Sequence, residues 1–171
     1  MISRDRTFRL MAARAELAMQ EGGDVAFTVT SSAFSNGSAV PKQFTCDGND
    51  SPPPISVVDL PDETKSFAIV MDDPDAPRGT FTHWLAYDIP ADGGTLHSDR
   101  GKTLKNDFGR EGYGGPCPPP GDGAHRYHVT VYAVDVPSLD VRGPGRDDLE
   151  AALHDHTLGK ARLSGRYERE A

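Results

Sequence analysis

Apolar residues in this chain occur in short segments, and stretches rich in glycine and proline separate them. The chain has 171 residues, including 18 glycines and 14 prolines. Several segments alternate apolar with polar residues or form short apolar runs, and both patterns are typical of β-strands. We predict strands at five places: 25–34, 65–73, 81–89, 125–136 and 160–169. Frequent turns between short strands favour an antiparallel β-sandwich.

One segment departs from this pattern. RDDLEAALHDHTLG (146–159) has acidic residues in its first turn, where they suit the helix dipole, and Gly159 stands where a helix end is expected. We therefore predict mainly β structure with one peripheral helix in the C-terminal region.

Length and charge narrow the class of protein further. The length suits one domain, which we place at 25–171, preceded by a short amphipathic extension at 1–24 whose ends we expect to fray. A formal net charge of −8 disfavours nucleic acid as a partner, because phosphate backbones select basic surfaces. No apolar run approaches the roughly 20 residues that span a bilayer. Arg14 and Glu16 interrupt the N-terminal apolar stretch, so we do not expect a secretion signal. We expect a cytoplasmic location instead.

The chain contains two cysteines, Cys46 and Cys117. Two cysteines do not define a disulfide framework, and in a reducing compartment we expect free thiols. Pairing stays open, and if it occurs it closes a long loop.

Polar side chains lie at one end of three predicted strands. Side chains two apart on a strand share a face, so Asp73 shares one with Phe67, Ile69 and Met71. By the same rule His83 lies with Phe81, Leu85, Tyr87 and Ile89, and His125 and Tyr127 lie with Val129 and Val131. If these strands are neighbours, Asp73, His83, His125 and Tyr127 meet at one mouth of the core.

This combination of side chains suits a small anion. A carboxylate beside an imidazole favours the protonated ring or fixes its tautomer, so that an N–H points into the cavity. Histidine, tyrosine and glycine-rich backbone donors together bind phosphate or acetate. Each residue alone has a plainer interpretation, since an Asp before proline forms turns, strand-end histidines are often solvated, and Trp84 suits core packing.

Four stretches of this sequence together resemble a known family. They are DDPDAP (72–77), THWLAYDIP (82–90), GYGGPCPPPGDGAHRYHVTVYAVD (112–135) and HTLGKARLSGRY (156–167). They resemble the phosphatidylethanolamine-binding proteins, and most closely the bacterial and archaeal Raf-kinase-inhibitor-like branch. The resemblance extends from about Val25 to Arg169.

The resemblance implies a large antiparallel sheet packed on a smaller one and a cavity for phosphate or carboxylate groups, including the head group of phosphoethanolamine lipids. It places Asp73, His83, His125, Tyr127, Pro118 and Pro119 in that cavity, and Trp84, Tyr113, Gly115 and Cys117 at its rim. It implies a protein that binds without catalysis or cofactor, with a kinase or protease as protein target. A homodimer is compatible with the sequence.

The alternative is a hydrolase or metal-dependent enzyme that uses Asp73, His83 and His125. No Gly-x-Ser-x-Gly or His-Glu-x-x-His motif supports it. A thiol–imidazole pair of Cys117 and His125 is a further catalytic arrangement that the sequence leaves open.

Overall fold

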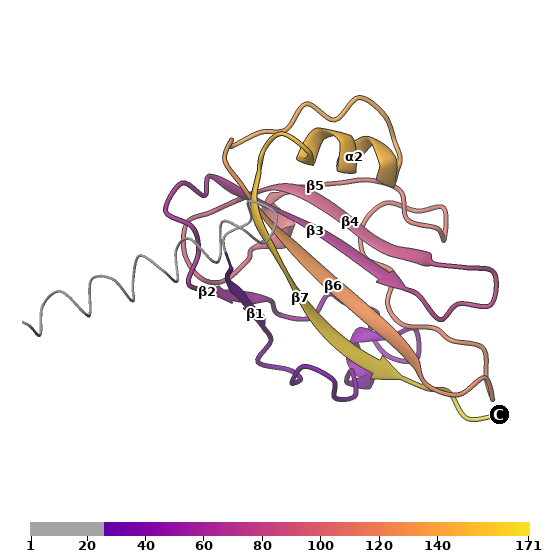
Figure 1. The fold of residues 1–171 in the computed structure, drawn as a ribbon. Helices are drawn as coiled ribbons and strands as arrows, with labels where there is room; N and C mark the ends of the chain where they lie inside the picture. The colour runs from indigo at the N-terminus through magenta and orange to yellow at the C-terminus, as the bar shows by residue number, and fades with distance from the viewer. Residues whose placement is uncertain (1–25) are drawn as a thin grey trace, which may run out of the picture.

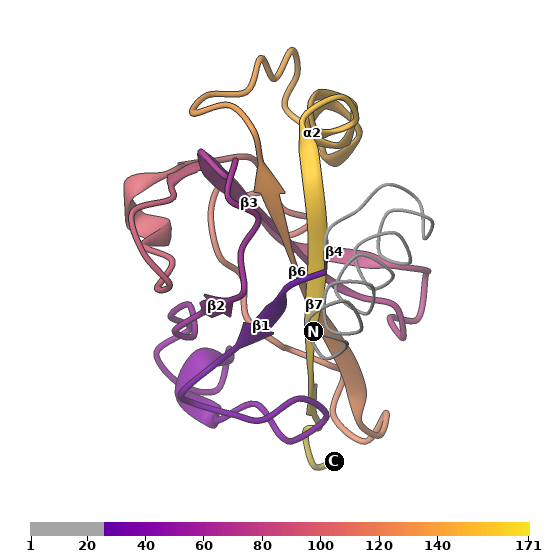
Figure 2. The same ribbon diagram turned by 60° about the vertical axis from the view of Figure 1, so that its left-hand side comes forward.

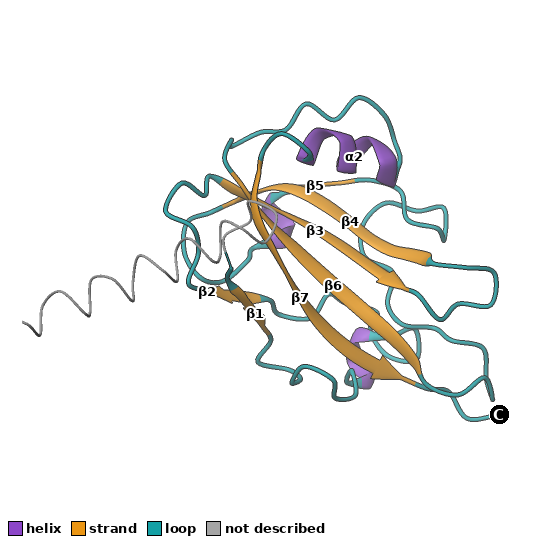
Figure 3. Cartoon of the chain, in the orientation of Figure 1, coloured by secondary structure: helices purple, strands orange, loops and turns teal. Residues whose placement is uncertain are grey.

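The computed structural model describes residues 26–171, and the predicted extension at 1–24 lies outside them. Figure 1 shows the arrangement of the strands and Figure 3 their extent along the chain. The strands are β1 (Thr28–Thr30), β2 (Ser56–Val58), β3 (Ser66–Asp73), β4 (Phe81–Pro90), β5 (Lys102–Thr103), β6 (His125–Val134) and β7 (Thr157–Tyr167). The helices are α2 (Arg146–Leu153) and two short 3-10 turns, η1 (Lys42–Phe44) and η2 (Ser98–Arg100).

The strands form two sheets, and the predicted sandwich of a large and a small sheet is confirmed. The larger sheet has the order β5-β4-β3-β6-β7, with antiparallel pairing throughout, and the smaller one pairs β1 with β2. Figure 2 shows the small sheet on one side of the large sheet, with α2 at its upper end. No helix within 26–171 is long and apolar enough to cross a membrane.

Both faces of the large sheet are covered. One core lies between the two sheets and includes Phe67, Ile69 and Met71 of β3, while Ala68 and Val70 pack in a second core with Leu149 and Leu153 of α2. Strand β3 is therefore apolar along most of its length, as expected for a strand that is buried on both sides.

Strand β4 does not follow the simple alternation predicted for it. Met71 pairs with Trp84 and Asp72 pairs with Thr82, so His83 is an extra residue in β4. Such a β-bulge redirects the side chains that follow it. As a result Trp84 lies in the core between the sheets, whereas Leu85 belongs to the core beneath α2.

A second irregularity in β4 reverses this shift, so that odd-numbered residues after it again face the core between the sheets. Phe67 pairs with Ile89 and Ile69 pairs with Ala86, so three steps on β4 match two on β3. Asp88, in this interval, has a positive φ of 54°. Ile89 thus returns to the core between the sheets, while Tyr87 packs against the α2 core, and the predicted common face for these residues is wrong.

Two predicted boundaries also need correction. The helix ends at Leu153 rather than near Gly159, because the chain enters the β6–β7 ladder at Thr157, where Gly159 pairs with Ala133. The hydroxyl of Thr157 donates to the carbonyl of Leu153 across this turn. The strand predicted at 25–34 is only β1, three residues long.

Cys46 and Cys117 form a disulfide, which corrects the expectation of free thiols. Their Cα atoms lie 5.5 Å apart and 71 positions separate them in sequence. The thiol–imidazole pair considered for Cys117 and His125 is therefore absent from this oxidised form. The expectation of free thiols followed from the expected cytoplasmic location, and because disulfides are rare in reducing compartments, the disulfide does not support that location.

Candidate functional site

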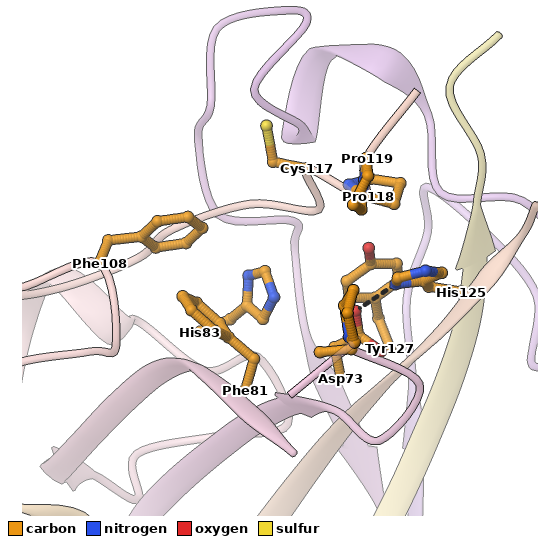
Figure 4. A pocket seen from close by; sticks show the side chains of 11 residues that line it. Asp73, Phe81, His83, Phe108, Cys117, Pro118, Pro119, His125 and Tyr127 are labelled. Carbon is orange, nitrogen blue, oxygen red and sulfur yellow. Dashed lines mark hydrogen bonds and ion pairs between the residues drawn. The ribbon is translucent and has the colours of Figure 1, made fainter. Parts of the chain in front are cut away.

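A pocket of about 190 Å³ opens at the end of the large sheet where β3 ends and β4 and β6 begin. Figure 4 shows its lining. Seven of the residues predicted for the site lie on its wall: Asp73, His83, Cys117, Pro118, Pro119, His125 and Tyr127. The predicted convergence of polar residues from three separate strands is therefore present in the structure.

The acidic turn that follows β3 is held by the beginning of β6. Asp73 Oδ1 accepts a hydrogen bond from the backbone N–H of Asp75 at 2.8 Å, which closes the turn. Asp75 in turn accepts bonds from the backbone N–H and the guanidinium of Arg126, all within 2.9 Å. This pairing strongly lowers the pKa of Asp75. The Asp-Pro-Asp turn and the His-Arg-Tyr segment are thus joined into one rigid corner.

His125 lies between two carboxylates. Its Nδ1–H donates to Asp73 at 2.6 Å and its Nε2–H donates to Asp122 at 2.7 Å. The ring is 3 % exposed, and burial alone disfavours its charge, but the two carboxylates outweigh burial and raise its pKa. Because both ring nitrogens donate to carboxylates, His125 is an imidazolium. Its N–H groups are used internally, which differs from the prediction that one of them points into the cavity.

His83 has the opposite electrostatic state. Its Nδ1 lies 2.7 Å from the carbonyl oxygen of Gly114, and a carbonyl only accepts, so Nδ1 carries the proton. The ring is 3 % exposed and packs edge-on against three aromatic rings, those of Phe81, Phe108 and Tyr127. Burial lowers its pKa, although the carbonyl of Gly114 and the charge of Asp73 act against this change. His83 is therefore neutral at pH 7 and has a lone pair on Nε2.

Tyr127 carries a buried hydroxyl without a protein partner. The residue is 1 % exposed, and its Oη is the one buried side-chain polar atom within 26–171 that makes no hydrogen bond. Burial raises its pKa, the charge and close approach of the Asp73 carboxylate raise it further, and the backbone N–H of Cys117 acts in the opposite direction. In Figure 4 the hydroxyl points into the space below Pro118 and Pro119. Leaving such a group unsatisfied is costly, so this atom indicates where a ligand or water binds.

The wall that faces these side chains is fixed to another loop of the chain. Besides the disulfide, the backbone N–H of Cys46 donates to Pro116 at 3.1 Å and that of Gly115 donates to Asp50 at 2.7 Å. The hydroxyl of Tyr113 donates to the carbonyl of Phe44 at 2.7 Å. These bonds order the long glycine- and proline-rich segment at 106–124, which has no strand or helix of its own.

Three residues predicted at the rim do not line the pocket. Trp84 is buried in the core, 5.2 Å from the ring of Tyr113 in an edge-on contact, as its plainer interpretation suggested. Tyr113 and Gly115 anchor the wall rather than form it. A Cβ at Gly115 would overlap the carbonyl oxygen of Phe44, which explains why glycine occupies this close approach.

The structure also adds residues that the sequence did not single out. Ala76, Pro77 and Phe108 line the pocket, and Asp122 binds His125 from outside it. Asp122 lies three residues before His125 in a glycine-flanked turn, and this spacing is the signal that could have identified it. No lysine or arginine lines this pocket, and no group of three potential ligands within 26–171 is placed to hold a metal ion.

Comparison with known proteins identifies the family. The family model described as phosphatidylethanolamine-binding protein matches residues 30–168. The chain belongs to the phosphatidylethanolamine-binding protein family. Its similarity to a UPF0098 protein of Aquifex aeolicus is 46 % identity over 157 residues, which covers 86 % of this chain and 92 % of the relative. A second UPF0098 protein, from Pyrococcus horikoshii, is 44 % identical over 81 % of this chain and 75 % of its own length.

Solved structures of the phosphatidylethanolamine-binding protein family have the same fold. A homolog from Chlamydia trachomatis, CT736, matches with a TM-score of 0.77 and 35 % identity, covering 85 % of this chain and 99 % of the other. YbcL of Escherichia coli, described as a member of the mammalian family, matches with a TM-score of 0.75 and 28 % identity over 84 % of this chain and 99 % of its own.

Proposed function

We propose that this chain is a non-catalytic binding protein whose pocket takes a small anion or a phosphorylated head group. The observation that carries the proposal is the unpartnered hydroxyl of Tyr127 inside the pocket. A phenol at this depth has a raised pKa and stays protonated, so it can donate to a phosphate or carboxylate oxygen.

The size of the pocket supports a head group rather than a whole lipid. Its volume, about 190 Å³, is below the roughly 300–1,000 Å³ that is usual for drug-sized ligands. The proline walls and the disulfide keep it formed without a ligand, which lowers the entropy cost of binding. A phosphate on a lipid and a phosphate on a kinase or protease target present the same chemistry here, and competition between O-phosphoethanolamine and O-phosphoserine would separate these sources.

Calorimetric titration with O-phosphoethanolamine at pH 7 tests the proposal. We expect saturable one-to-one binding that weakens about tenfold or more in Tyr127→Phe, because a hydrogen bond to a charged group contributes about 1.5–3 kcal/mol. Tyr132→Phe is the matched control, since Tyr132 lies on the same strand and packs against the other core. Absence of binding, or equal loss in both variants, contradicts the proposal.

The same samples distinguish binding from hydrolysis. We expect O-phosphoethanolamine to be recovered intact after incubation with the protein, as followed by ³¹P NMR. Release of inorganic phosphate that depends on His83 or Asp73 would favour the hydrolase alternative instead.

A further inference from the structure

We propose that the pocket binds its phosphate ligand together with one proton, which is held between a phosphate oxygen and Nε2 of His83. This inference rests on the proposed function and specifies which protonation state of a phosphomonoester the site accepts. It follows from the distribution of donors, acceptors and charges around the pocket.

The His83 ring has a fixed orientation in the pocket. The bond from Nδ1–H to the Gly114 carbonyl fixes the proton on the nitrogen that faces the backbone. Nε2 is therefore an acceptor in the neutral ring, and the side-chain hydrogen bond that His83 makes within 26–171 is the one from Nδ1. A fully deprotonated phosphate oxygen brought to this nitrogen would place two lone pairs against each other.

The charged groups around the pocket have a negative balance. The imidazolium of His125 is flanked by the carboxylates of Asp73 and Asp122, which leaves this cluster with a negative balance. The guanidinium of Arg126 is directed to Asp75. The free hydroxyl of Tyr127 is neutral, and no lysine or arginine lines the pocket. Nothing in the pocket wall therefore compensates both charges of a phosphate dianion.

Several titratable groups face His83 from the elements packed against it. From β3 it faces Asp73, with Asp72 further away and paired with Arg146 of α2. From β6 it faces Tyr127, which stays protonated, and beyond it His125, which already carries its proton. The loop at 106–124 contributes the ring of Phe108 and the carbonyls of Gly114 and Gly115, none of which titrates. His83 is thus the neutral base best placed to accept a proton when an anion arrives.

The proton balance of binding follows from these states. Phosphomonoesters lose their second proton near pH 6, so above pH 7 the free ligand is a dianion and free His83 is neutral. Binding then removes one proton from solvent, and that proton forms the bond between the phosphate oxygen and Nε2. No covalent bond of the ligand is made or broken.

Calorimetric titration with O-phosphoethanolamine in two buffers of different ionisation enthalpy counts this proton. Between pH 7.5 and 8.5 we expect uptake of one proton per ligand and a Kd that rises about tenfold. His83→Gln places a non-titrating amide near the position of Nε2, so its weaker binding should show no proton uptake and no dependence on pH. His128→Gln, on the opposite face of β6, is the matched control and should behave as the wild type.

Three results separate this inference from the proposed function. Binding without proton uptake and with a constant Kd overturns the inference alone. Proton uptake that persists in His83→Gln also overturns it, because another group then carries the proton. Absence of binding between pH 6 and 8.5 overturns the proposed function and the inference together. As an independent readout, the ¹⁵N shift of His83 Nε2 at pH 8 should move to the value of a protonated nitrogen on ligand addition.

Discussion

Neighbouring polar residues at the end of β3 have different partners, although the sequence presents them as one acidic run. Asp72 binds Arg146 of α2 at 2.9 Å on one face of the sheet, whereas Asp73 binds His125 at 2.6 Å on the other. Asp75 forms the bidentate pair with Arg126. The strand alternation that separates adjacent side chains also separates their functions, and only Asp73 belongs to the pocket.

The imidazolium of His125 predicts a dependence of stability on pH. Its pKa is raised on folding, so its contribution is fully present below the unfolded value of about 6.5 and is lost as pH rises through the higher folded value. His83 has a lowered pKa and acts in the opposite sense, with its contribution present above about 6.5 and lost as pH falls. As pH rises above about 6.5 we therefore expect the His125 contribution to the free energy of unfolding to decline.

Urea unfolding of the wild type and of Asp122→Asn between pH 6 and 9 measures this decline. Removal of one of the two carboxylates lowers the folded pKa of His125, so the variant should lose less stability over this range. Asp155→Asn makes the same charge change at an exposed site and should keep the wild-type profile. Parallel profiles in all three proteins would show that His125 is not the titrating group.

At the scale of elements, the wall of the pocket depends on a crosslink rather than on secondary structure. The disulfide joins the loop after η1 to the segment that carries Pro118 and Pro119, and it closes a loop across 71 positions. In the chain-entropy model such a crosslink stabilises the folded state by about 4 kcal/mol.

We expect the double variant Cys46→Ala/Cys117→Ala to lose about 4 kcal/mol of unfolding free energy and to bind O-phosphoethanolamine more weakly. Both losses have one cause, because the same segment carries the wall and the Gly114 carbonyl that orients His83. Denaturant titration, with the chemically reduced wild type as a parallel sample, measures the first and calorimetry the second. An unchanged denaturation midpoint would contradict the claim that the disulfide is the main interaction that holds this wall in place.

The bulges in β4 mark the limit of what strand patterns predict. Alternation correctly grouped Phe67, Ile69 and Met71 on β3, and it also grouped Tyr127 with Val129 on β6, because both strands pair in register over most of their length. It failed on β4 beyond His83, since an extra residue shifts the face without leaving a signal in the pattern of apolar residues. Strand alternation also did not reach Asp122, which lies in the loop before β6, and only its spacing of three residues from His125 in a glycine-flanked turn indicated the contact.

At the scale of the whole molecule, the pocket and α2 lie on different faces of the large sheet. The core that includes Tyr127 and Trp84 is separate from the one built on Leu149 and Leu153. The predicted sandwich and the predicted late helix are both present, since strand spacing and helix signals are local properties of the sequence. The packing of the helix on the far face needed the structure.

This separation predicts that stability and binding can be changed independently. Leu149 is fully buried between α2 and the large sheet, so Leu149→Ala should cost about 2–5 kcal/mol in unfolding free energy. The affinity for O-phosphoethanolamine, measured without denaturant, should stay within about twofold, well under the tenfold change that corresponds to about 1.4 kcal/mol. A tenfold loss of affinity in the folded variant would mean that the two cores are coupled through the sheet.

The most direct measurement is a crystal structure of the protein soaked with O-phosphoethanolamine at pH 7. We expect an intact phosphomonoester in the pocket, with one phosphate oxygen within hydrogen-bond distance of Tyr127 Oη and another within that distance of His83 Nε2. A phosphate bound elsewhere on the surface, a cleaved ester, or an occupied pocket in which Tyr127 Oη stays without a partner would contradict it.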